Sequence, residues 1–489
     1  VSFLWEKHLC VLEQYLATRP RVVITLRGAI TVELRRVVSA VGGTLVALED
    51  LLDPGEIQTI MKNAAAVNLN ASHAMSEKGW ASFAESMQLD AERLKPLITD
   101  LLLPCVQQGM FLVEALEKAS REYFIELLVV SEDWTSVPRC AVGWAKTHSI
   151  PTLHLLHGVA LLRAYTVHST VLSDVVAVFS KRGAESLLDA GVPEERIRVT
   201  GNPAWDIYPS LRERREQIRH GIFTGYGLNR ALPLVVFGTT WDAKLTALSN
   251  ADIYRRTLSV FLSACHTLIQ DGVSANFLVK DHPHNFAVGT ETIAQIADDL
   301  HLPRERLFHA TADTEALLIS ADIVICVDSN MTVEALLAGV PAINLVEALG
   351  LRLGPSFDGQ SGVLDVVPAE LSTTIRLLLE DAPLRGSIVE AMRAKADYYN
   401  VGQDGKATER VVALMAEMAL KRVENEMPLQ DKGYVWEELA KGEEAELKGE
   451  YHNFPRRELV EMFVRKPLMV LEICFAAVTI GALIKQVYP

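Results

Sequence analysis

Apolar residues in the first part of the chain gather into short runs that alternate with longer segments of helical spacing. The runs RVVITL at 21–26, FIELLVV at 124–130 and DVVAVFS at 174–180 are rich in β-branched residues, as expected of strands buried on both faces. Segments such as 29–41 and 181–190 carry apolar residues three and four positions apart, which predicts amphipathic helices. This alternation predicts a parallel sheet with right-handed crossovers.

The same scheme recurs in the second part of the chain. The segments LPLVVFGTT, NFLVKDHPH, DIVICVDS and PAINLVE are predicted strands with polar ends, separated by helical segments. Between the two parts, residues 201–215 carry two prolines and then a run of charged residues, which is typical of a domain boundary. We therefore predict an α/β protein with domains at residues 1–209 and 210–422. A helical connector and an apolar tail would follow at 423–489.

The apolar tail has a feature of its own at residues 468–484. The sequence LMVLEICFAAVTIGALI carries one glutamate and follows Arg456, Arg457, Arg465 and Lys466. It is slightly short for a membrane-spanning helix, which needs about 20 apolar residues. We favour a segment that lies on the membrane surface, with a helix packed on the protein or on a partner chain as the alternative.

Composition and charge narrow the function. A chain of 489 residues with 49% hydrophobic residues suits two globular domains. A net charge of -15 argues against a general nucleic-acid binder, which needs a basic surface. The six cysteines form no CxxC pair, which favours reduced thiols in the cytoplasm. The sequence has no motif of a nucleotide-hydrolysing loop, a zinc peptidase or a serine nucleophile, and we expect neither a metal site nor a cofactor.

Polar residues follow the predicted strands of the second domain. In open α/β sheets, ligands bind beyond the carboxyl ends of the strands. Gly238, Thr239 and Thr240 follow one strand, and a glycine there lets the backbone approach an anion. Lys280 and His282 follow the next, and either side chain suits a phosphate, while Pro283 fixes the backbone. A polar loop without a ligand is the alternative.

A third block in the second domain is DSNMTVEALLAGVPAINL, residues 328–345. Ser329 or Asn330 is expected to cap the helix, whose first amides would then face an anion such as a phosphate. Glu334, one turn into the helix, suits the hydroxyl groups of a ribose. Capping alone would also explain the serine and the asparagine.

The first domain offers candidates for acid-base chemistry at its own strand ends. His157 follows the strand TLHLL, and Glu132 with Asp133 follows the strand at 124–130. A histidine or a carboxylate at such a position can accept a proton from a hydroxyl group. The alternative for His157 is a histidine satisfied by backbone contacts, and a carboxylate at 132 or 133 could instead stabilise a cationic transition state.

The motifs HLLHG (154–158), VTGNPAWD (199–206), KDHPH (280–284) and the block at 312–345 resemble those of bacterial GT-B glycosyltransferases that build capsules, lipopolysaccharide and teichoic acids. The His-Pro pair is similar to one in Kdo- and sialyltransferases, and the His-Gly pair to one in CDP-glycerol glycerophosphotransferases. The resemblance implies two Rossmann-like doubly wound domains with a cleft between them, the first for the acceptor and the second for the donor. It places a group of residues on the donor nucleotide: His282, Pro283, Ser329, Asn330, Thr332 and Glu334. It makes Asp133 or His157 the group that activates the acceptor, although Trp134 stands where sialyltransferases have glycine.

The function implied by this resemblance is metal-independent sugar transfer in surface polysaccharide synthesis. The expected partners are a nucleotide-sugar donor, preferably a CMP-linked acidic sugar, and a glycan or glycolipid acceptor. CDP-glycerol and UDP-sugar donors are alternatives. So is an isomerase similar to UDP-N-acetylglucosamine 2-epimerase, or a scaffold that has lost turnover. The enzyme is expected in the cytoplasm, at the inner face of the membrane.

Overall fold

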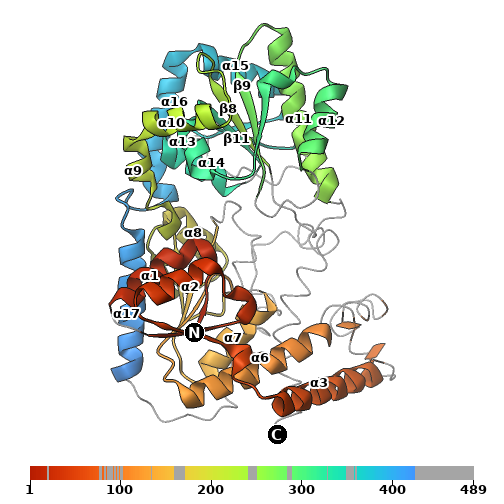
Figure 1. The fold of residues 1–489 in the computed structure, drawn as a ribbon, viewed down its shortest axis with the longest axis vertical. Coiled ribbons are helices and arrows are strands. Elements are labelled where there is room, and N and C mark those ends of the chain that lie inside the picture. The colour runs from red at the N-terminus through yellow and green to blue at the C-terminus, as the bar shows by residue number, and fades with distance from the viewer. Residues whose placement is uncertain are drawn as a thin grey trace.

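The computed structural model describes residues 1–18, 21–75, 80–81, 84, 92, 95, 98–99, 103–133, 135–158, 171–239, 250–282, 289–327, 329–348, 357 and 361–424. These residues form two α/β units arranged along the long axis of the molecule (Figure 1). The predicted fold class is confirmed. Thr240, Pro283 and the apolar tail at 468–484 lie outside the described residues.

The described part of the first unit contains a parallel sheet of five strands in the order β1-β4-β5-β6-β7. Its strands are β1 (Ser2–Phe3), β4 (Leu128–Val130), β5 (Thr152–Leu155), β6 (Val175–Val178) and β7 (Ile197–Val199). A further parallel pair, β2 (Val22–Thr25) and β3 (Thr44–Ala47), lies next to β1. The sequence analysis did not predict β1, because two residues are too few to show a pattern of apolar and polar positions.

Helices cover the sheet of the first unit. They are α1 (Leu9–Ala17), α2 (Val32–Ala40), α3 (Pro54–Ala74), α6 (Leu103–Glu122), α7 (Ser136–Thr147) and α8 (Lys181–Asp189). The start of α3 shows how local sequence fixes an element. The Asp53 carboxylate accepts from the Glu56 amide at 2.9 Å, and the Glu56 carboxylate accepts from the Asp53 amide at 2.7 Å. This reciprocal pairing satisfies amides that the helix itself leaves unpaired.

The second unit contains a parallel sheet whose described strands run in the order β10-β9-β8-β11-β12-β13. They are β8 (Leu234–Gly238), β9 (Asn276–Lys280), β10 (Leu307–Ala310), β11 (Ile323–Cys326), β12 (Ala342–Leu345) and β13 (Leu364–Val366). Counted within the unit this is the order 3-2-1-4-5-6 of a doubly wound dinucleotide-type fold. The strand order therefore reverses between β8 and β11, which is where such folds bind ligands.

The helices of the second unit pack on both faces of its sheet. They are α9 (Tyr208–Glu213), α10 (Arg215–Gly225), α11 (Asn250–Gln270), α12 (Gly289–Asp299), α13 (Thr314–Ser320), α14 (Asn330–Ala338), α15 (Leu371–Glu380) and α16 (Ala382–Tyr399). Their apolar faces and the sheet share one core that includes the stacked rings of Phe237 and Phe261, whose centroids lie 4.7 Å apart. No helix among the described residues is both long enough and apolar enough to cross a membrane.

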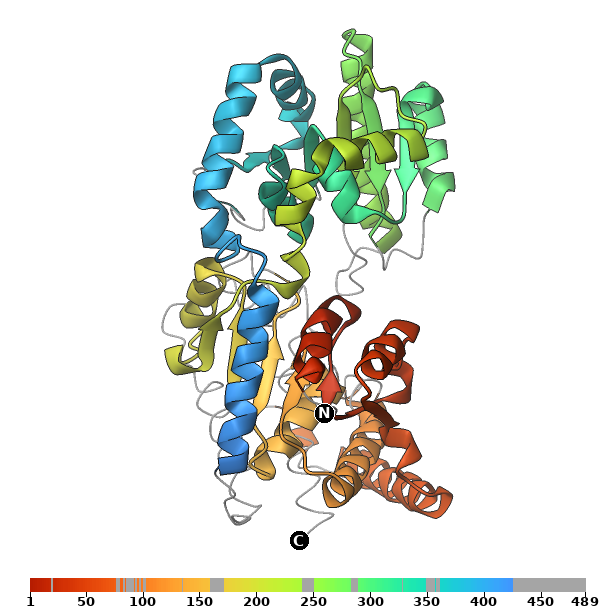
Figure 2. The same cartoon turned by 60° about the vertical axis from the view of Figure 1, so that its left-hand side comes forward.

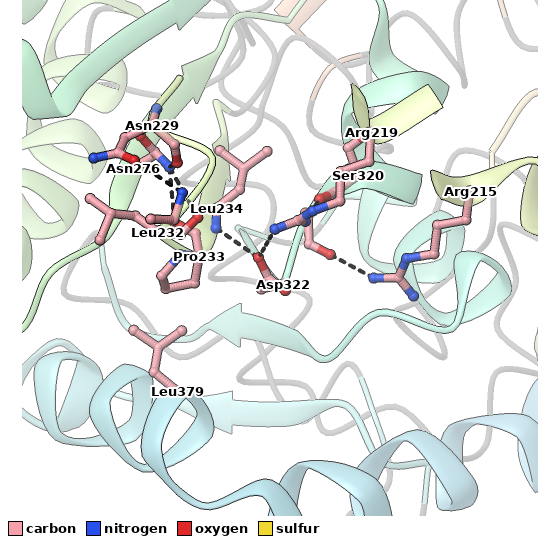
Figure 3. Close-up of polar contacts among 12 residues, drawn as sticks. Arg215, Arg219, Asn229, Leu232, Pro233, Leu234, Asn276, Ser320, Asp322 and Leu379 are labelled. Carbon is pink, nitrogen blue, oxygen red and sulfur yellow. Dashed lines mark hydrogen bonds and ion pairs between the residues drawn. The ribbon is translucent and has the colours of Figure 1, made fainter. Parts of the chain in front are cut away.

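Polar contacts fasten α10 to the amino ends of the second sheet (Figure 3). The Asp322 carboxylate accepts from the Arg219 guanidinium and from the Leu234 amide, each at 2.8 Å. Arg215 donates to the Ala321 carbonyl at 3.0 Å. These contacts lie at the amino ends of β8 and β11, whereas the predicted ligand loops follow the carboxyl ends. They therefore stabilise the fold of the second unit and take no part in the predicted site.

The chain passes between the two units twice, and the two crossings are bonded to each other. The Asn202 amide donates to the Asn400 side chain at 2.8 Å. The Asp206 carboxylate accepts from the amides of Ala407 and Thr408 at 2.8 and 2.7 Å. Asp206 thereby caps a helix that begins 201 positions further along the chain.

That capped helix, α17 (Ala407–Glu424), returns to the first unit. It packs against α1, and Figure 2 shows it running alongside the first sheet. Val411 and Met415 of α17 share a core with Val11 and Tyr15 of α1. The sequence-based division differs from this packing, because it grouped residues 407–422 with the second domain.

Candidate functional site

The loops that follow β8 and β11 meet at the point where the strand order of the second sheet reverses. A Cβ atom on Gly238 would lie 2.5 Å from Met331 Sδ and 3.3 Å from Cys326 Sγ. The absence of a side chain at Gly238 therefore lets the first turn of α14 approach the end of β8. Close packing against Met331 is therefore sufficient to explain the glycine at position 238. The contact lies beside the end of α14 where the sequence predicted a phosphate.

The loops after β8 and β9 are fastened to each other. The Thr239 amide donates to the Lys280 carbonyl at 3.0 Å, and the His282 amide donates to Thr239 Oγ1 at 2.9 Å. Thr239 is buried, so its hydroxyl serves the backbone of His282. The structure thus brings Gly238, Thr239, His282 and the start of α14 into one group.

Lys280 is turned toward the protein interior. Its side chain is buried, and Nζ donates to the Asp281 carbonyl at 2.6 Å and to the Thr311 carbonyl at 3.4 Å. Burial lowers the pKa of Lys280, although nearby carboxylates led by Asp281 oppose that effect. This geometry fits a lysine that holds the loop after β9.

Asp281 is the centre of a network that the sequence analysis did not predict. Its buried carboxylate accepts from the Tyr254 hydroxyl at 2.9 Å and lies 2.6 Å from His309 Nε2. The Asp281 amide also donates to the Ala310 carbonyl at 2.8 Å. These contacts fix the carboxyl end of β9 and hence the residue that follows it, His282.

The start of α14 is capped as predicted. Ser329 Oγ accepts from the Met331 amide at 3.3 Å. Asn330 is the first residue of the helix, and Thr332, in its first turn, is fully buried. The Thr332 amide donates to the Ser329 carbonyl at 3.0 Å, so Ser329 satisfies two amides of this first turn.

Glu334 has partners that compete with the predicted ribose contact. Its carboxylate accepts from Trp205 Nε1 at 3.0 Å and from the Tyr208 hydroxyl at 3.2 Å. Trp205 belongs to the segment that joins the two units, and Tyr208 begins α9. Burial raises the pKa of Glu334, and Glu315 adds to this, while the two donors oppose it. Glu334 therefore links the second unit to the crossing segment.

Asp133 is buried under the end of the first sheet. Its Oδ2 accepts from the amides of Leu172 and Ser173, both at 2.9 Å, and from Ser173 Oγ at 2.8 Å. Its Oδ1 lies 3.4 Å from Nδ1 of the buried His154. Burial by itself would raise the pKa of Asp133, but His154 and the donors of Ser173 outweigh burial and hold it below the usual range. The geometry fits a carboxylate that anchors residues 172–173.

Glu132 is half-buried next to Asp133. Its Oε1 accepts from Thr135 Oγ1 at 2.8 Å. Burial raises the pKa of Glu132, and the Thr135 bond opposes that shift. The Thr135 bond ties Glu132 to the start of α7, at the same sheet end as Asp133.

His157 follows β5 and is oriented by two contacts. Its Nδ1 lies 3.2 Å from the Ser131 carbonyl oxygen, and its ring packs against Trp5 at a tilt of 35°, with centroids 4.3 Å apart. A carbonyl oxygen only accepts hydrogen bonds, so this contact assigns the ring proton to Nδ1. Nε2 of the neutral ring then carries the lone pair that a general base needs.

The loop after β1 contributes residues that the sequence analysis missed. The Trp5 amide donates to Ser131 Oγ at 2.9 Å, and Nδ1 of the buried His8 lies 2.9 Å from the same oxygen. Lys7 Nζ donates to the His157 carbonyl. The sequence signal for this loop was the short apolar run VSFLW at residues 1–5. The strand within it, β1, ends at Phe3, just before the loop.

The two units meet where these loops face each other. A Cβ atom on Gly158 would lie 3.0 Å from Nδ2 of Asn330. The His157-Gly158 turn of the first unit therefore lies against the first residue of α14 in the second. Among the described residues, no three His, Cys, Asp or Glu side chains are grouped so as to hold a metal ion.

Two doubly wound units that join at the carboxyl ends of their strands define the GT-B fold. No protein-family model matches the sequence, and no curated protein matches it either. A solved structure of a putative UDP-N-acetylglucosamine 2-epimerase from Listeria monocytogenes is similar at a TM-score of 0.50 and 14% identity. The match covers 88% of this chain and 97% of that one.

Two further solved structures resemble the chain more loosely. A glycosyltransferase from Rickettsia africae has a TM-score of 0.49 and 11% identity, over 86% of this chain and 97% of its own. UDP-GlcNAc 2-epimerase from Neisseria meningitidis, bound to UDP-GlcNAc, has a TM-score of 0.47 and 15% identity, over 64% and 82%. At such identities the Listeria structure supports the shared fold, and the function must be argued from the site.

Proposed function

We propose that the protein is a glycosyltransferase that moves a sugar from a nucleotide-activated donor to a glycan or glycolipid acceptor. The observation that carries the proposal is the contact between Gly158 and Asn330. This contact brings together the turn that carries His157, whose Nε2 is the unprotonated ring nitrogen, and the amino end of α14, which suits a phosphate. A base and a leaving-group site are the two elements that direct sugar transfer requires.

The residues divide the proposed reaction between the units. His157 Nε2 accepts the proton of the acceptor hydroxyl as its oxygen bonds to the anomeric carbon of the donor sugar. The bond from that carbon to the phosphate oxygen breaks, and the nucleotide leaves with the bonding electrons. The partial positive charge at the amino end of α14 and the His282 side chain stabilise the charge that develops on the phosphate.

The donor we propose is a CMP-linked acidic sugar, such as Kdo or a sialic-acid-like sugar, used to build surface polysaccharide. The support is the resemblance of the His282-Pro283 pair to the one in Kdo- and sialyltransferases. CDP-glycerol and UDP-sugars are the competing donors. We also propose that residues 468–484 attach the enzyme to the inner face of the cytoplasmic membrane.

A thermal-shift panel with CMP, CDP, UDP and GDP tests the donor class, since a ligand that binds the native state raises its melting temperature. We expect the largest shift with CMP. A larger shift with UDP or CDP would reject the CMP-linked donor. No shift with any nucleotide would reject the glycosyltransferase proposal.

An isomerase with the same fold is the second candidate, because the Listeria structure named as a putative epimerase matches most of the chain. Incubation with UDP-N-acetylglucosamine and no acceptor separates the two. Formation of UDP-N-acetylmannosamine would favour the isomerase, whereas a transferase leaves the configuration at C2 of the sugar unchanged.

A further inference from the structure

Ser131 follows β4 and makes a different contact with each of its polar groups. It is fully buried, and its amide donates to the Phe3 carbonyl of β1 at 3.4 Å. Its carbonyl oxygen lies 3.2 Å from His157 Nδ1, and its hydroxyl accepts from the Trp5 amide at 2.9 Å. One residue therefore contacts both the proposed base and the residue whose ring packs against that base.

The Ser131 carbonyl and the Trp5 ring restrain different parts of the His157 imidazole. The carbonyl meets the edge of the ring at Nδ1, and the indole packs against the ring at a centroid distance of 4.3 Å and a tilt of 35°. The χ2 torsion of a histidine is broad by itself, so the two contacts together restrict the ring more than either alone. They fix the direction of Nε2, on which proton transfer depends.

The position of the Trp5 ring depends on the Ser131 hydroxyl. Trp5 is 39% exposed, so core packing contributes little to its position. Its backbone is held on both sides, because its amide donates to Ser131 Oγ and its carbonyl accepts from the His8 amide at 2.9 Å. Loss of the hydroxyl would release one of these two attachments.

His8 supports the Ser131 hydroxyl from inside the first unit. Its side chain is fully buried, and its Nδ1 lies 2.9 Å from Ser131 Oγ. The Trp5 amide is a donor, so Oγ accepts from it and keeps its own proton for Nδ1 of His8. Burial, with Lys7 and His154 adding to it, lowers the pKa of His8 to about 3, so its ring stays neutral and can accept this hydrogen bond at physiological pH.

We propose that Ser131 is a positioning residue for His157, which it orients through its carbonyl at the ring edge and through its hydroxyl by way of Trp5. The inference rests on the proposed function, in which His157 accepts the proton of the acceptor hydroxyl. Ser131 itself touches no reacting atom in that scheme. Because its hydroxyl acts through Trp5, removing the hydroxyl should have no further effect once the indole is gone.

The test is a double-mutant cycle of Ser131→Ala and Trp5→Leu, followed by two measurements. Heteronuclear NMR of protein labelled in its histidine nitrogens shows which ring nitrogen of His157 is protonated, and His157→Asn assigns the signal. Release of CMP from CMP-N-acetylneuraminic acid, or of UDP from UDP-N-acetylglucosamine, measures turnover, with water in place of the acceptor. The matched control is Ser173→Ala, which removes another fully buried hydroxyl at the same end of the sheet, bonded to Asp133 at 2.8 Å.

We expect Ser131→Ala and Trp5→Leu each to turn the single Nδ1–H form of His157 into a mixture of tautomers. Each should lower kcat about 2- to 10-fold, as for loss of one aromatic contact, with KM unchanged. The double variant should match Trp5→Leu, and Ser131→Thr, which keeps the hydroxyl, should keep most of the rate. Ser173→Ala should lower the melting temperature and leave the His157 tautomer unchanged.

Three results would overturn the inference. They are a wild-type His157 protonated at Nε2, additive losses in the double variant, and an unchanged tautomer or an unchanged rate in Ser131→Ala. Should Ser131→Ala fail to fold, Ser131→Cys keeps the buried volume with a weaker hydrogen-bonding group and repeats the measurement. Absence of nucleotide release by the wild-type protein would instead count against the proposed function, while the NMR spectra would still decide whether Ser131 orients His157.

Discussion

Replacing Asp133 by alanine would separate an anchoring role for this carboxylate from a catalytic one. The change leaves three donors without an acceptor, the amides of Leu172 and Ser173 and the Ser173 hydroxyl, and it removes the carboxylate beside the buried His154. A buried donor left without its partner costs about 1–3 kcal/mol, so three such donors, partly relieved by relaxation, should cost about 3–5 kcal/mol. At about 2–4 °C per kcal/mol for a unit of this size, the melting temperature of the first unit should fall by roughly 6–20 °C.

Differential scanning calorimetry of Asp133→Ala, with Asp50→Ala as a control, measures this difference. The Asp50 carboxylate is 61% exposed and pairs with Arg27 at the surface, so its loss should cost only about 0–1 kcal/mol. The pKa of Asp133 is held below its usual range, so its contribution to stability is complete above the ordinary aspartate pKa of about 3.9. It is lost as the pH falls through the depressed value. Asp133→Ala should therefore weaken the acid dependence of the melting temperature. If the variant melted like the wild type but could no longer transfer sugar, the anchoring role would be wrong and Asp133 would belong to the chemistry.

Three further predictions follow from the site. Gly238→Ala forces a Cβ atom against Met331 Sδ and should lower the free energy of unfolding by about 1–3 kcal/mol in calorimetry. The control Gly221→Ala, which has open space in helix α10, should be neutral or stabilising, and equal effects of the two changes would contradict the packing argument. Burial raises the pKa of Glu334, so the folded state loses stability as the pH rises past the ordinary glutamate pKa. Glu334→Gln should remove this fall in melting temperature between pH 4 and 8, and an unaltered pH profile would refute the prediction. His157→Asn should lower kcat about 10²- to 10⁴-fold with nucleotide Kd unchanged, and an intact kcat in transfer assays would exclude His157 as the base.

The sequence pattern predicted the parts of the fold that repeat. Long apolar runs such as the one ending at Gly238 have strand periodicity and small or polar residues at their ends, so β8, β9 and β11 and the helix cap at Ser329 were all placed correctly. A strand of two residues carries no pattern of its own. β1 was missed for this reason, and Trp5 and Lys7 were missed with it.

Residue roles that depend on distant partners could not be derived from the pattern. Asp133 and the amides that it accepts from are 39 and 40 positions apart, and Glu334 and Trp205 are 129 apart. Nothing in the local sequence distinguishes a carboxylate that meets such donors from one that meets a substrate. The return of α17 to the first unit is hidden for the same reason, because its cap, Asp206, lies at the other crossing.

The paired crossings limit how the two units can move. A single linker would leave one unit free to turn against the other, but here two chain segments cross between the units and are bonded to each other through Asn202, Asn400 and Asp206. Any relative rotation of the units must therefore deform both segments together, and the bonds between them oppose a twist of one segment against the other. Loss of these bonds is expected to loosen the connection between the units.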